Sequence, residues 1–500
     1  MALLACALVV ATLAPGVAPH VDAASRYRKR TVRLGPGLTL TRMLDRRGPN
    51  RVRILKVDPS TTLTTDVALA RDKLPGLERT SSMARRRGAV AAVNGDYTIH
   101  PFDAGAGRPI NAFARNGSLK TSPLIWGRNF AVSQDEDNFY FDHAPLKVSL
   151  SQRDSGELWS IQAWNERGPT RDVLSVSTPA GGLSFRPLTH ACSARLLPRG
   201  RMSWGEGKVG VRRTYEVDRV RCSADRLRRG GGLVVSAGRG APAGQTIRAS
   251  LSRGEVVDLT WSMGTWAGVL DTIGGNPLLV AEGLIAAETC TGSYFCYRNP
   301  RTGIGITSSG KLLLVTVDGR RPGWSTGMTP IGFARLFRFL GARWALNLDG
   351  GGSTTMWVKD KIVNRPSDPG GERAVGSSIL VLPVRDPSEP RPLDPPSKPV
   401  RSGLVTGALA SMVPSIASGD GREDPARLTS LDPASTGGML DALARGAFGP
   451  MGPTLPRSVR PVLQRFRDRY GGPIGRPLRP LRLPSWLGPA APVGAPEGRR

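Results

Sequence analysis

The sequence predicts a mixed α/β fold of the α+β type, in which a few helices pack on a central sheet of buried strands. Short runs rich in Val, Ile and Leu alternate with turn signals from about residue 32 to residue 384. Two runs, residues 311–317 and 343–348, are almost continuously apolar, as is typical of strands buried on both faces. Between them, residues 328–341 have apolar side chains at helical spacing. We therefore expect a single large domain followed by a long tail.

Six segments of this region combine β-branched or apolar residues with a turn signal at one end. Several of the turn signals are Asn-Gly or Asp-Gly pairs, which are common in tight turns between strands. The predicted strands, in chain order, are RVRILKVDP (51–59), GAVAAVNGD (88–96), KLLLVTVDG (311–319), RWALNLDG (343–350), TMWVKDKIVN (355–364) and GSSILVLP (376–383).

Two helices are predicted from start and stop signals. In MTPIGFARLFRFLG (328–341), Thr329 can cap the helix, Pro330 suits its first turn and Gly341 ends it. An earlier helix is expected in SSMARRRG (81–88), with Ser81 or Ser82 as its cap.

Composition divides the chain into four parts. Residues 1–23 contain an apolar run that ends in a Val-Asp-Ala cleavage pattern, which predicts a signal peptide and export. Residues 24–31 read as a basic linker, residues 32–384 as the folded domain, and residues 385–500 as a Pro- and Arg-rich, largely disordered tail. No later stretch reaches the roughly 18 apolar residues of a membrane span. We expect a secreted or extracellular protein, with the cell wall as one location.

The chain is strongly basic, with 69 Lys and Arg against 40 Asp and Glu and a formal charge of +29. Such a surface attracts anions, of which an anionic cell-surface polymer bound through the basic tail is one candidate. An Arg-rich composition without a specific partner is the alternative. No nucleic-acid-binding motif is present, so we expect no nucleic acid partner. In the tail, residues 458–470 could form a basic amphipathic helix on an anionic surface or a marginal helix within disorder.

Four cysteines remain after Cys6 in the predicted signal peptide is set aside. In an oxidising compartment, the economical pairing joins cysteines that are near in sequence. A zinc site is the alternative, although the spacings fit no common zinc pattern and the four histidines do not cluster with the cysteines. The predicted disulfides are Cys192–Cys222 and Cys290–Cys296.

Polar residues and glycines gather where the predicted strands end. Each cluster alone is an ordinary turn, but together they predict one site, because carboxylates, arginines and glycines recur where buried strands would reach the surface. The candidates are Asn94, Gly95 and Asp96; Arg301 and Thr302; Asp318 and Arg320; Asn347, Asp349, Gly350, Gly351, Gly352, Ser353 and Thr354; and Asn364, Glu372 and Arg373.

Residues 301–383, from RTGIGITSSG to GSSILVLP, resemble the signature half of the phosphodiester glycosidase family. AAVNGDYT (91–98), WNERG (164–168) and TIGGNPLLVAEG (272–283) resemble further motifs of that family, in the same order. Gly303 stands where the family commonly has alanine, and Asp96-Tyr97 replace its frequent Gly-Phe. Residues 145–230 show little resemblance.

The resemblance implies hydrolysis of the bond between a sugar anomeric carbon and a phosphodiester oxygen. That reaction needs cations and N–H donors around phosphate and a carboxylate that faces the anomeric carbon. We therefore expect catalytic carboxylates and a phosphate-binding set, with the remaining candidates lining the substrate site. The expected catalytic residues are Asp349 and Glu372, ranked ahead of Asp318; the phosphate ligands are Arg301, Arg320, Arg373, the amides of Gly350, Gly351 and Gly352, and the hydroxyls of Ser353 and Thr354.

Structural interpretations of the same residues stay open. The triple glycine could be a strand turn, and Glu372 or Asp318 could simply pair with Arg373 or Arg320. We expect no cofactor, and a Ca²⁺ ion held by Asp318 and Asp349 is the alternative. At the level of function, the alternatives to an exported hydrolase of phosphorylated glycans are a non-catalytic protein that binds anionic wall polymers and a glycosidase with no phosphate requirement.

Overall fold

The computed structural model describes most of the chain between residues 26 and 383. The described residues are 26–59, 62–99, 106–123, 127–133, 138–142, 146–166, 173–181, 191–205, 210–222, 232–238, 245, 247, 249–287 and 294–383. The predicted signal peptide, the whole of the predicted tail and Cys290 lie outside them. None of the described helices is long and apolar enough to cross a membrane.

Sheet I contains eight antiparallel strands drawn from both ends of the described chain. Its strands β23 (Leu312–Val317) and β22 (Arg301–Thr307) lie at the centre. Every residue of β23 is buried, which confirms that this apolar run packs on both faces. The order across the sheet is β1 (Tyr27–Gly35), β2 (Leu38–Asp45), β3 (Asn50–Val57), β23, β22, β24 (Ala342–Asn347), β20 (Leu278–Ala281) and β21 (Leu284–Ile285).

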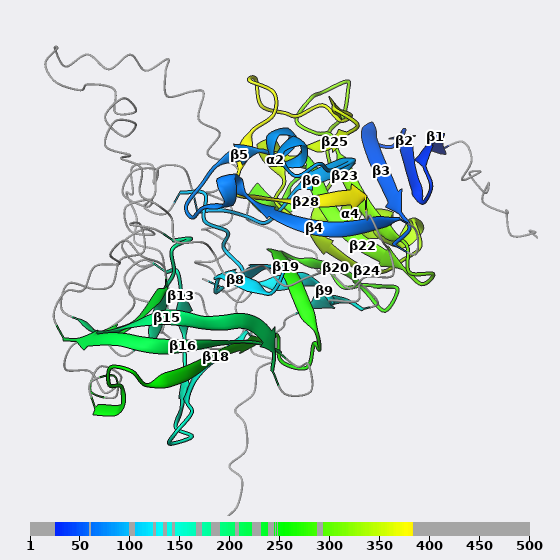
Figure 1. The fold of residues 1–500 in the computed structure, drawn as a ribbon. Helices are drawn as coiled ribbons and strands as arrows, with labels where there is room; N and C mark the ends of the chain where they lie inside the picture. Colours follow the sequence, from blue (N-terminus) through cyan, green and yellow to red (C-terminus); the bar gives the residue numbers. More distant parts are fainter. Residues whose placement is uncertain are drawn as a thin grey trace, which may run out of the picture. The chain divides into compact units, whose positions relative to one another are not determined.

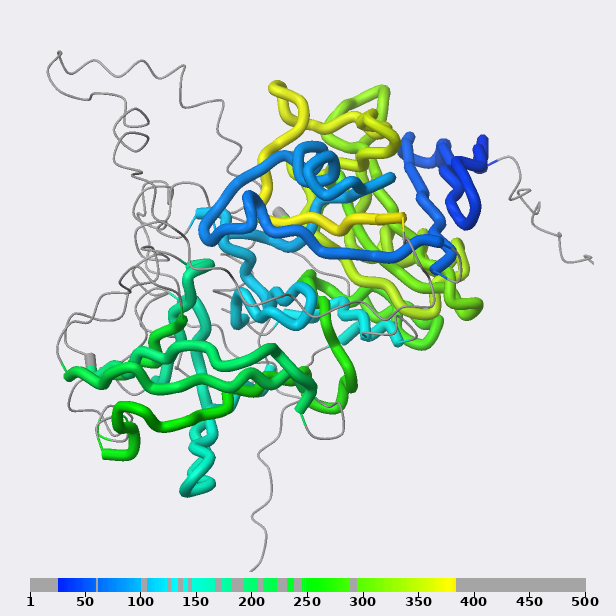
Figure 2. Tube along the Cα trace, viewed as in Figure 1, coloured from blue at the N-terminus to red at the C-terminus, as the bar shows by residue number. Residues whose placement is uncertain are grey.

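Sheet II places the predicted strand near the end of the domain, residues 376–383, beside the predicted strand 88–96. The yellow strand β28 lies between the blue strands β4 and β6 in the view of Figure 2, as the strand pairing requires. The order is β26 (Lys361–Ile362), β25 (Met356–Val358), β6 (Ala91–Asn94), β28 (Ser377–Pro383) and β4 (Leu63–Leu69). A two-stranded ribbon, β5 (Glu78–Arg79) and β27 (Ala374–Val375), adjoins it in sequence.

Two helices complete a helix–sheet–sheet–helix arrangement (Figure 1). Helix α4 (Pro330–Phe339) packs Phe333 and Phe337 on one face of sheet I. The other face of sheet I shares a core with sheet II, and helix α2 (Thr80–Arg86) packs on the far side of sheet II. The predicted α+β class is confirmed, with strands forming most of the ordered structure.

Two further sheets come from the middle of the chain, which the sequence analysis left without assigned strands. Sheet III has the order β10 (Phe139–Asp142), β9 (Arg128–Ser133), β19 (Val269–Gly275), β7 (Phe113–Arg115) and β8 (Ser118–Thr121). Sheet IV has the order β12 (Leu158–Ser160), β11 (Lys147–Gln152), β18 (Val256–Ser262), β16 (Gly210–Arg221), β15 (Ala191–Trp204), β17 (Leu233–Gly238), β14 (Ser175–Ser177) and β13 (Ala163–Trp164). Three short 3₁₀ turns are η1 (Ala70–Asp72), η4 (Tyr294–Cys296) and η5 (Gly351–Ser353).

The predicted disulfide Cys192–Cys222 is present and links the start of β15 to the end of β16. Cys296 is also disulfide-bonded. The zinc alternative is wrong for the first pair, because its two sulfur atoms are joined to each other.

Some predicted boundaries are wrong. Residues 27–31 form part of β1 instead of a linker, because their backbone pairs with β2 and the Tyr27 ring packs 4.6 Å from the Phe339 ring. The predicted strand 355–364 is two short strands joined at Lys359 and Asp360, whose φ angles of 43° and 64° form a tight turn. The Thr329 cap is confirmed, since its side chain accepts a hydrogen bond from the Gly332 amide.

Candidate active site

The triple-glycine bend, Gly350 to Gly352, follows β24. It lies beside the first residues of β22 and the last residues of β6. The amide of Leu348 donates to Thr302 O (2.9 Å), and the amide of Asp349 donates to Gly95 O (3.0 Å). Two residues further, the amide of Gly351 donates to Pro300 O at 3.0 Å. These three bonds tie the bend to two other strand ends. The predicted convergence of distant polar segments is therefore present.

Asn94 is the centre of this convergence and is completely buried. Its Nδ2 donates to Asp349 O at 2.7 Å. Its Oδ1 accepts from Thr302 Oγ1 at 2.7 Å and from the Thr355 amide at 3.1 Å. Asn94 and Thr302, whose side chains are both buried, thus fix the backbone around Asp349.

The carboxylate of Asp349 is half-buried at the mouth of the bend. Its Oδ1 accepts a hydrogen bond from the Gly350 amide at 2.8 Å. Burial raises the pKa of Asp349 to about 6, while hydrogen bonding from Ser353 and the charge of Arg373 act in the opposite direction, as Gly350 and Arg320 do more weakly. A carboxylate with this pKa is ionised at neutral pH and remains able to exchange a proton near it, which suits acid–base or nucleophilic work.

Arg320 and Arg373 approach the bend from two different loops. A Cβ atom on Gly351 would lie 2.8 Å from Arg320 Nη2, and one on Gly352 would overlap Arg373 Nη2. Arg320 donates from Nε to Asn299 Oδ1 at 3.1 Å. The two glycines therefore let two guanidinium groups come within contact of the backbone beside Asp349.

This arrangement corrects the expected role of the glycine amides. The amides of Gly350 and Gly351 donate to Asp349 Oδ1 and Pro300 O. The amides of Ser353 and Thr354 are also used inside the chain, because they donate to Gly350 O and Gly351 O. Two of the three glycine amides expected to bind an anion are therefore already bonded within the chain. Its glycines serve close packing, and the positive charge comes from the arginine side chains.

Glu372, expected as a catalytic carboxylate, lies against helix α2 instead. Its two oxygens accept from the Ser81 amide (2.8 Å) and the Ser81 hydroxyl (2.5 Å). A carboxylate at a helix N-terminus satisfies an orphan amide and is favoured by the helix dipole. The residue before the helix is Arg79, so neither Ser81 nor Ser82 is the cap residue itself.

Arg301 and Asp318 are also held by the fold. Arg301 is buried and donates to the carbonyls of Met328, Phe295 and Tyr297 at 2.8, 2.6 and 3.0 Å. Asp318 is buried and accepts from the Arg365 amide at 2.9 Å. Burial raises the pKa of Asp318, and the hydrogen bond from Arg365 acts in the opposite direction. The expected phosphate contact of Arg301 and the expected catalytic role of Asp318 have no support in these contacts.

Neither expected acid–arginine pair is formed as predicted. Arg373 pairs with Asp368, its Nε and Nη2 lying 2.7 and 2.9 Å from the two carboxylate oxygens. The pair is bidentate, a geometry that orients the planar guanidinium group. The sequence analysis missed Asp368 and Asn299, which orient the two arginines, because neither stands at a predicted strand end.

The remaining candidates, Asn347, Asn364, Thr354 and Gly95, form contacts within the protein around the bend. Asn347 Nδ2 donates to Tyr97 Oη at 2.7 Å, and Asn364 Nδ2 donates to Thr354 O at 3.0 Å. Asn347 and Thr354 are buried. A Cβ atom on Gly95 would lie 2.5 Å from the Ile273 side chain, so this glycine also allows close packing.

Asp96 is a second buried carboxylate whose charge interacts with that of Asp349. Its oxygens accept from the amide and the Nδ2 of Asn111 at 2.9 and 2.8 Å. Burial raises its pKa to about 7, and the negative charge of Asp349 adds to the increase. Asp96 is thus a group behind the site whose protonation is linked to that of Asp349.

Within the described residues, no group of three or more His, Cys, Asp or Glu side chains is arranged to hold a metal ion. The two carboxylates considered for Ca²⁺ have different neighbours. Asp318 lies near Arg53 and the Arg365 amide, whereas Asp349 lies near Arg320 and Arg373. Nothing in these contacts favours a shared cation.

Comparisons with known proteins show what the chain resembles. Residues 212–382 match the family model described as phosphodiester glycosidase, and this segment contains Asp349, Arg320 and Arg373. Over 105 residues the chain is 37% identical to a prophage-derived uncharacterized protein, YomE, of Bacillus subtilis. That match covers 21% of this chain and only 16% of the relative.

Two solved structures match parts of the chain. A hypothetical protein from Synechocystis matches with a TM-score of 0.56 and 20% identity, over 71% of this chain and 63% of that one. The catalytic domain of zebrafish N-acetylglucosamine-1-phosphodiester alpha-N-acetylglucosaminidase matches with a TM-score of 0.35 and 15% identity, over 73% of this chain and 85% of that one. The first similarity concerns the fold alone, and the second is too low to carry an argument. The family resemblance seen in the sequence is confirmed by the family model, in which residues 212–382 match a phosphodiester glycosidase domain.

Proposed function

We propose that this protein is an exported hydrolase that cleaves the bond between a sugar anomeric carbon and the oxygen of a phosphodiester. One observation carries the proposal: Asp349, with its pKa raised to about 6, lies beside the two guanidinium groups of Arg320 and Arg373. The family match over the segment that holds all three residues supports it. The Cys192–Cys222 disulfide supports an oxidising location outside the cytoplasm.

The chemistry divides between the acid and the two cations. Water supplies the oxygen that joins the anomeric carbon, and the bond from that carbon to the phosphate oxygen breaks. The electron pair of the broken bond stays on phosphate, which leaves as a monoester. Arg320 and Arg373 stabilise the charge that develops there, because a planar guanidinium binds phosphate oxygens in pairs. The Asp349 carboxylate acts on the anomeric carbon as nucleophile or, through water, as general base.

A phosphate leaving group lessens the need for a second carboxylate. Phosphate monoester is a stable anion, so a strong general acid is less necessary than for an alkyl glycoside. This agrees with the position of Glu372, whose oxygens are taken up by Ser81. The site thus has one reactive carboxylate and two cations.

Asp349→Asn tests the proposal because it removes the charge and keeps the shape. Purified protein should release free sugar from a sugar 1-phosphodiester, and Asp349→Asn should lower kcat by about 10² or more. Asp360→Asn is the matched control, since Asp360 is exposed and pairs with Arg85 on the surface. If Asp349→Asn keeps wild-type turnover, the assignment is wrong. Binding of the diester without any product would favour the non-catalytic alternative, and equal turnover of aryl glycosides would favour a general glycosidase.

A further inference from the structure

Three arginines lie directly opposite one another across the first three strands of sheet I. Arg30 of β1 pairs with Arg42 of β2, and Arg42 pairs with Arg53 of β3. Residues directly opposite on adjacent strands project from the same face, where like charges repel. We call these three residues the arginine ladder. A folded chain keeps such an arrangement at a cost, which a bound anion would remove.

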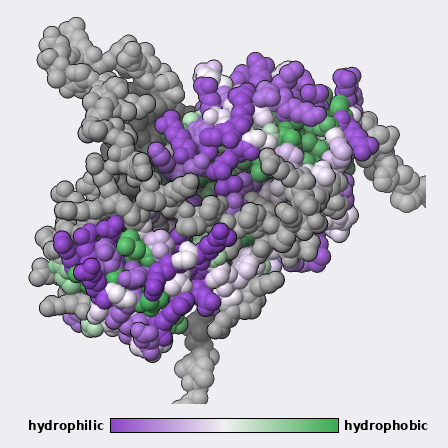
Figure 3. Space-filling model, viewed as in Figure 1, coloured by the Kyte–Doolittle hydropathy of each residue, from purple (hydrophilic) through white to green (hydrophobic). Residues whose placement is uncertain are grey.

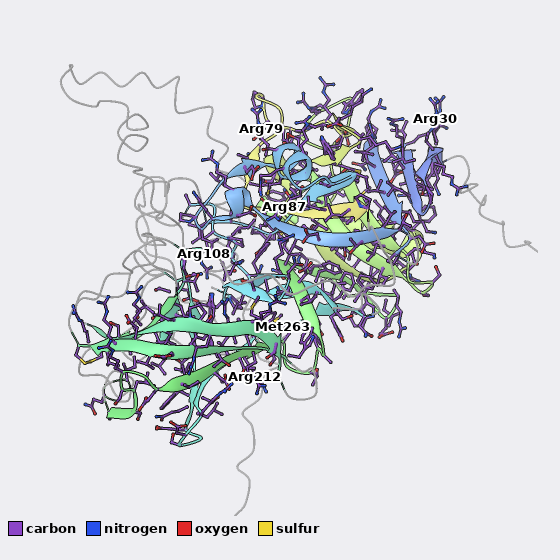
Figure 4. The ribbon with its side chains drawn as sticks, in the orientation of Figure 1. Arg30, Arg79, Arg87, Arg108, Arg212 and Met263 are labelled. Carbon is purple, nitrogen blue, oxygen red and sulfur yellow. A yellow bond between two sulfur atoms is a disulfide. The ribbon has the colours of Figure 1, made fainter. Side chains whose placement is uncertain are left out.

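The outer part of the ladder is exposed and carries its full charge. Arg30 and Arg42 are exposed, and neither forms an ion pair with any residue that the structure describes. Figure 4 labels Arg30 at the outer edge of sheet I, and Figure 3 shows hydrophilic residues in this part of the same view. On β1, Arg28 and Arg33 are exposed as well. Arg26 differs, because it is paired with Asp45 at 3.0 Å.

The inner end of the ladder is half-buried. Arg53 donates from Nε to Val363 O at 2.6 Å. Burial lowers the pKa of Arg53, and the charges of Arg42 and Arg51 lower it further, against the effect of Asp318. These electrostatic effects show that the cations are near enough to act on one another.

The ladder continues in register toward the candidate active site. Arg53 pairs with Thr316, and Thr316 pairs with Thr302. Thr302 Oγ1 donates to Asn94, whose side chain holds the Asp349 carbonyl. Four strand steps separate β1 from β22, which corresponds to roughly 19 Å at the usual spacing between strands. The same face of sheet I therefore carries the ladder at its outer edge and contacts the candidate active site at its centre.

We propose that the arginine ladder is a second binding surface, which holds a linear polymer with a phosphodiester in each repeat while one of its linkages is cleaved at Asp349. The identity of the polymer rests on the proposed function. A single sugar phosphate needs no more than Arg320 and Arg373. A row of arginines whose Cα atoms are about 5 Å apart on adjacent strands instead suits successive phosphates along a chain, since arginine binds phosphate in a planar, bidentate way.

Protection of a sheet edge is the competing explanation. Charged side chains on an edge strand prevent pairing with another chain, and this would account for Arg30 on β1. It does not account for Arg42 and Arg53, because β2 and β3 are interior strands. Placing like charges opposite each other there has no value for edge protection.

Binding of poly(glycerol phosphate) to the full-length protein tests the proposal. The test variant is Arg30→Gln with Arg42→Gln. The matched control is Arg335→Gln with Arg338→Gln, which removes two exposed charges from α4 on the opposite face of sheet I. The ladder variant should weaken binding about tenfold or more, because each arginine loses a charge-assisted phosphate contact. The control should change the affinity less than about twofold. Thermal unfolding of both variants checks that the fold is kept.

Chemical protection locates the contact within the whole chain. Polymer should shield Arg30 and Arg42 from phenylglyoxal and leave Arg335 and Arg338 reactive. Equal weakening by both double variants, or no shielding of the ladder, overturns the inference. Double-stranded DNA that competes equally at the same charge concentration would assign the surface to nucleic acid and also overturn it. Binding requires no turnover, so ladder-dependent binding without sugar release would refute the proposed function alone, and sugar release without ladder-dependent binding would refute the inference alone.

Discussion

Arg373 Nη2 lies where a side chain on Gly352 would have to be. A Cβ atom there would overlap both Arg373 Nη2 and Asp368 Oδ1, which are held together by their ion pair. Gly352→Ala must therefore displace the guanidinium group from its place beside Asp349. We expect kcat/KM for a sugar 1-phosphodiester to fall about tenfold or more. Gly370→Ala is the control, because nothing lies within 4 Å of its Cβ position; equal effects of the two changes would refute this role for Gly352.

Glu372→Ala should affect stability more than catalysis. The change removes the acceptor for the Ser81 amide and hydroxyl at the start of α2. Loss of such a contact typically costs about 1 kcal/mol of the free energy of unfolding. Urea unfolding measures that loss, and kcat should stay within about threefold of the wild type. A fall of kcat by about 10² in a stable variant would restore Glu372 to the catalytic set.

Arg320→Lys and Arg301→Lys should have different effects. Arg320 lies at the bend beside Asp349, so lysine there keeps the charge but loses the planar fork, and kcat/KM should fall about tenfold. Arg301 is buried and donates to three carbonyls, so lysine there should lower the free energy of unfolding by about 1–3 kcal/mol. Turnover and urea unfolding of both variants separate the two roles. Identical profiles for the two variants would contradict the assignment.

Activity should rise with pH through the pKa of Asp349. The reactive form is the carboxylate, so kcat/KM should increase with pH and reach half its plateau near pH 6, as burial sets that pKa at about 6. A profile that is flat from pH 5 to pH 7 would contradict a carboxylate in this role. The measurement is the initial rate of sugar release across that range.

Asp96 should make a pH-dependent contribution to stability. Its pKa is raised from 3.8 to about 7, so the folded state binds its proton more tightly than the unfolded state does. Stability must then decrease as the pH rises from about 4 to about 7. The melting temperature of the wild type, measured relative to that of Asp96→Asn, should therefore fall across this pH window. The difference should change little above pH 7. If the melting temperature of the wild type instead rises relative to that of Asp96→Asn as the pH increases, the raised pKa of Asp96 is refuted.

The sequence predicted several strands, and it predicted that their polar ends come together. It did not predict which partner each polar side chain would contact. A continuous apolar run such as β23 is enough to predict a buried strand. The cap at Thr329 is likewise predicted by neighbouring residues, since Thr329 directly precedes Pro330 and the apolar pattern of the helix. The glycines of the bend were correctly seen as unusual, but the amides of Gly350 and Gly351 are bonded within the chain, and guanidinium groups occupy the Cβ positions of Gly351 and Gly352. The contact between Glu372 and Ser81 was not predicted, because Ser81 lies 291 residues away in sequence. No local pattern carries that information.

Sheets III and IV were missed for a related reason. Several of their strands are short, and the two longest, β15 and β16, mix arginines with apolar residues, so they lack the apolar run that marks β23. Many of their contacts also join residues far apart in sequence, as with Thr272 and Ala114. The cross-strand position of Arg30, Arg42 and Arg53 likewise depends on register, which the order of residues alone does not determine.

Hydrolysis of a sugar 1-phosphodiester in ¹⁸O-labelled water tests the central claim most directly. If Asp349 acts at the anomeric carbon while Arg320 and Arg373 hold the departing phosphate, mass spectrometry will find the label in the released sugar and none in the phosphate monoester. Label in the phosphate product would mean that the phosphorus–oxygen bond breaks instead, and would contradict the account.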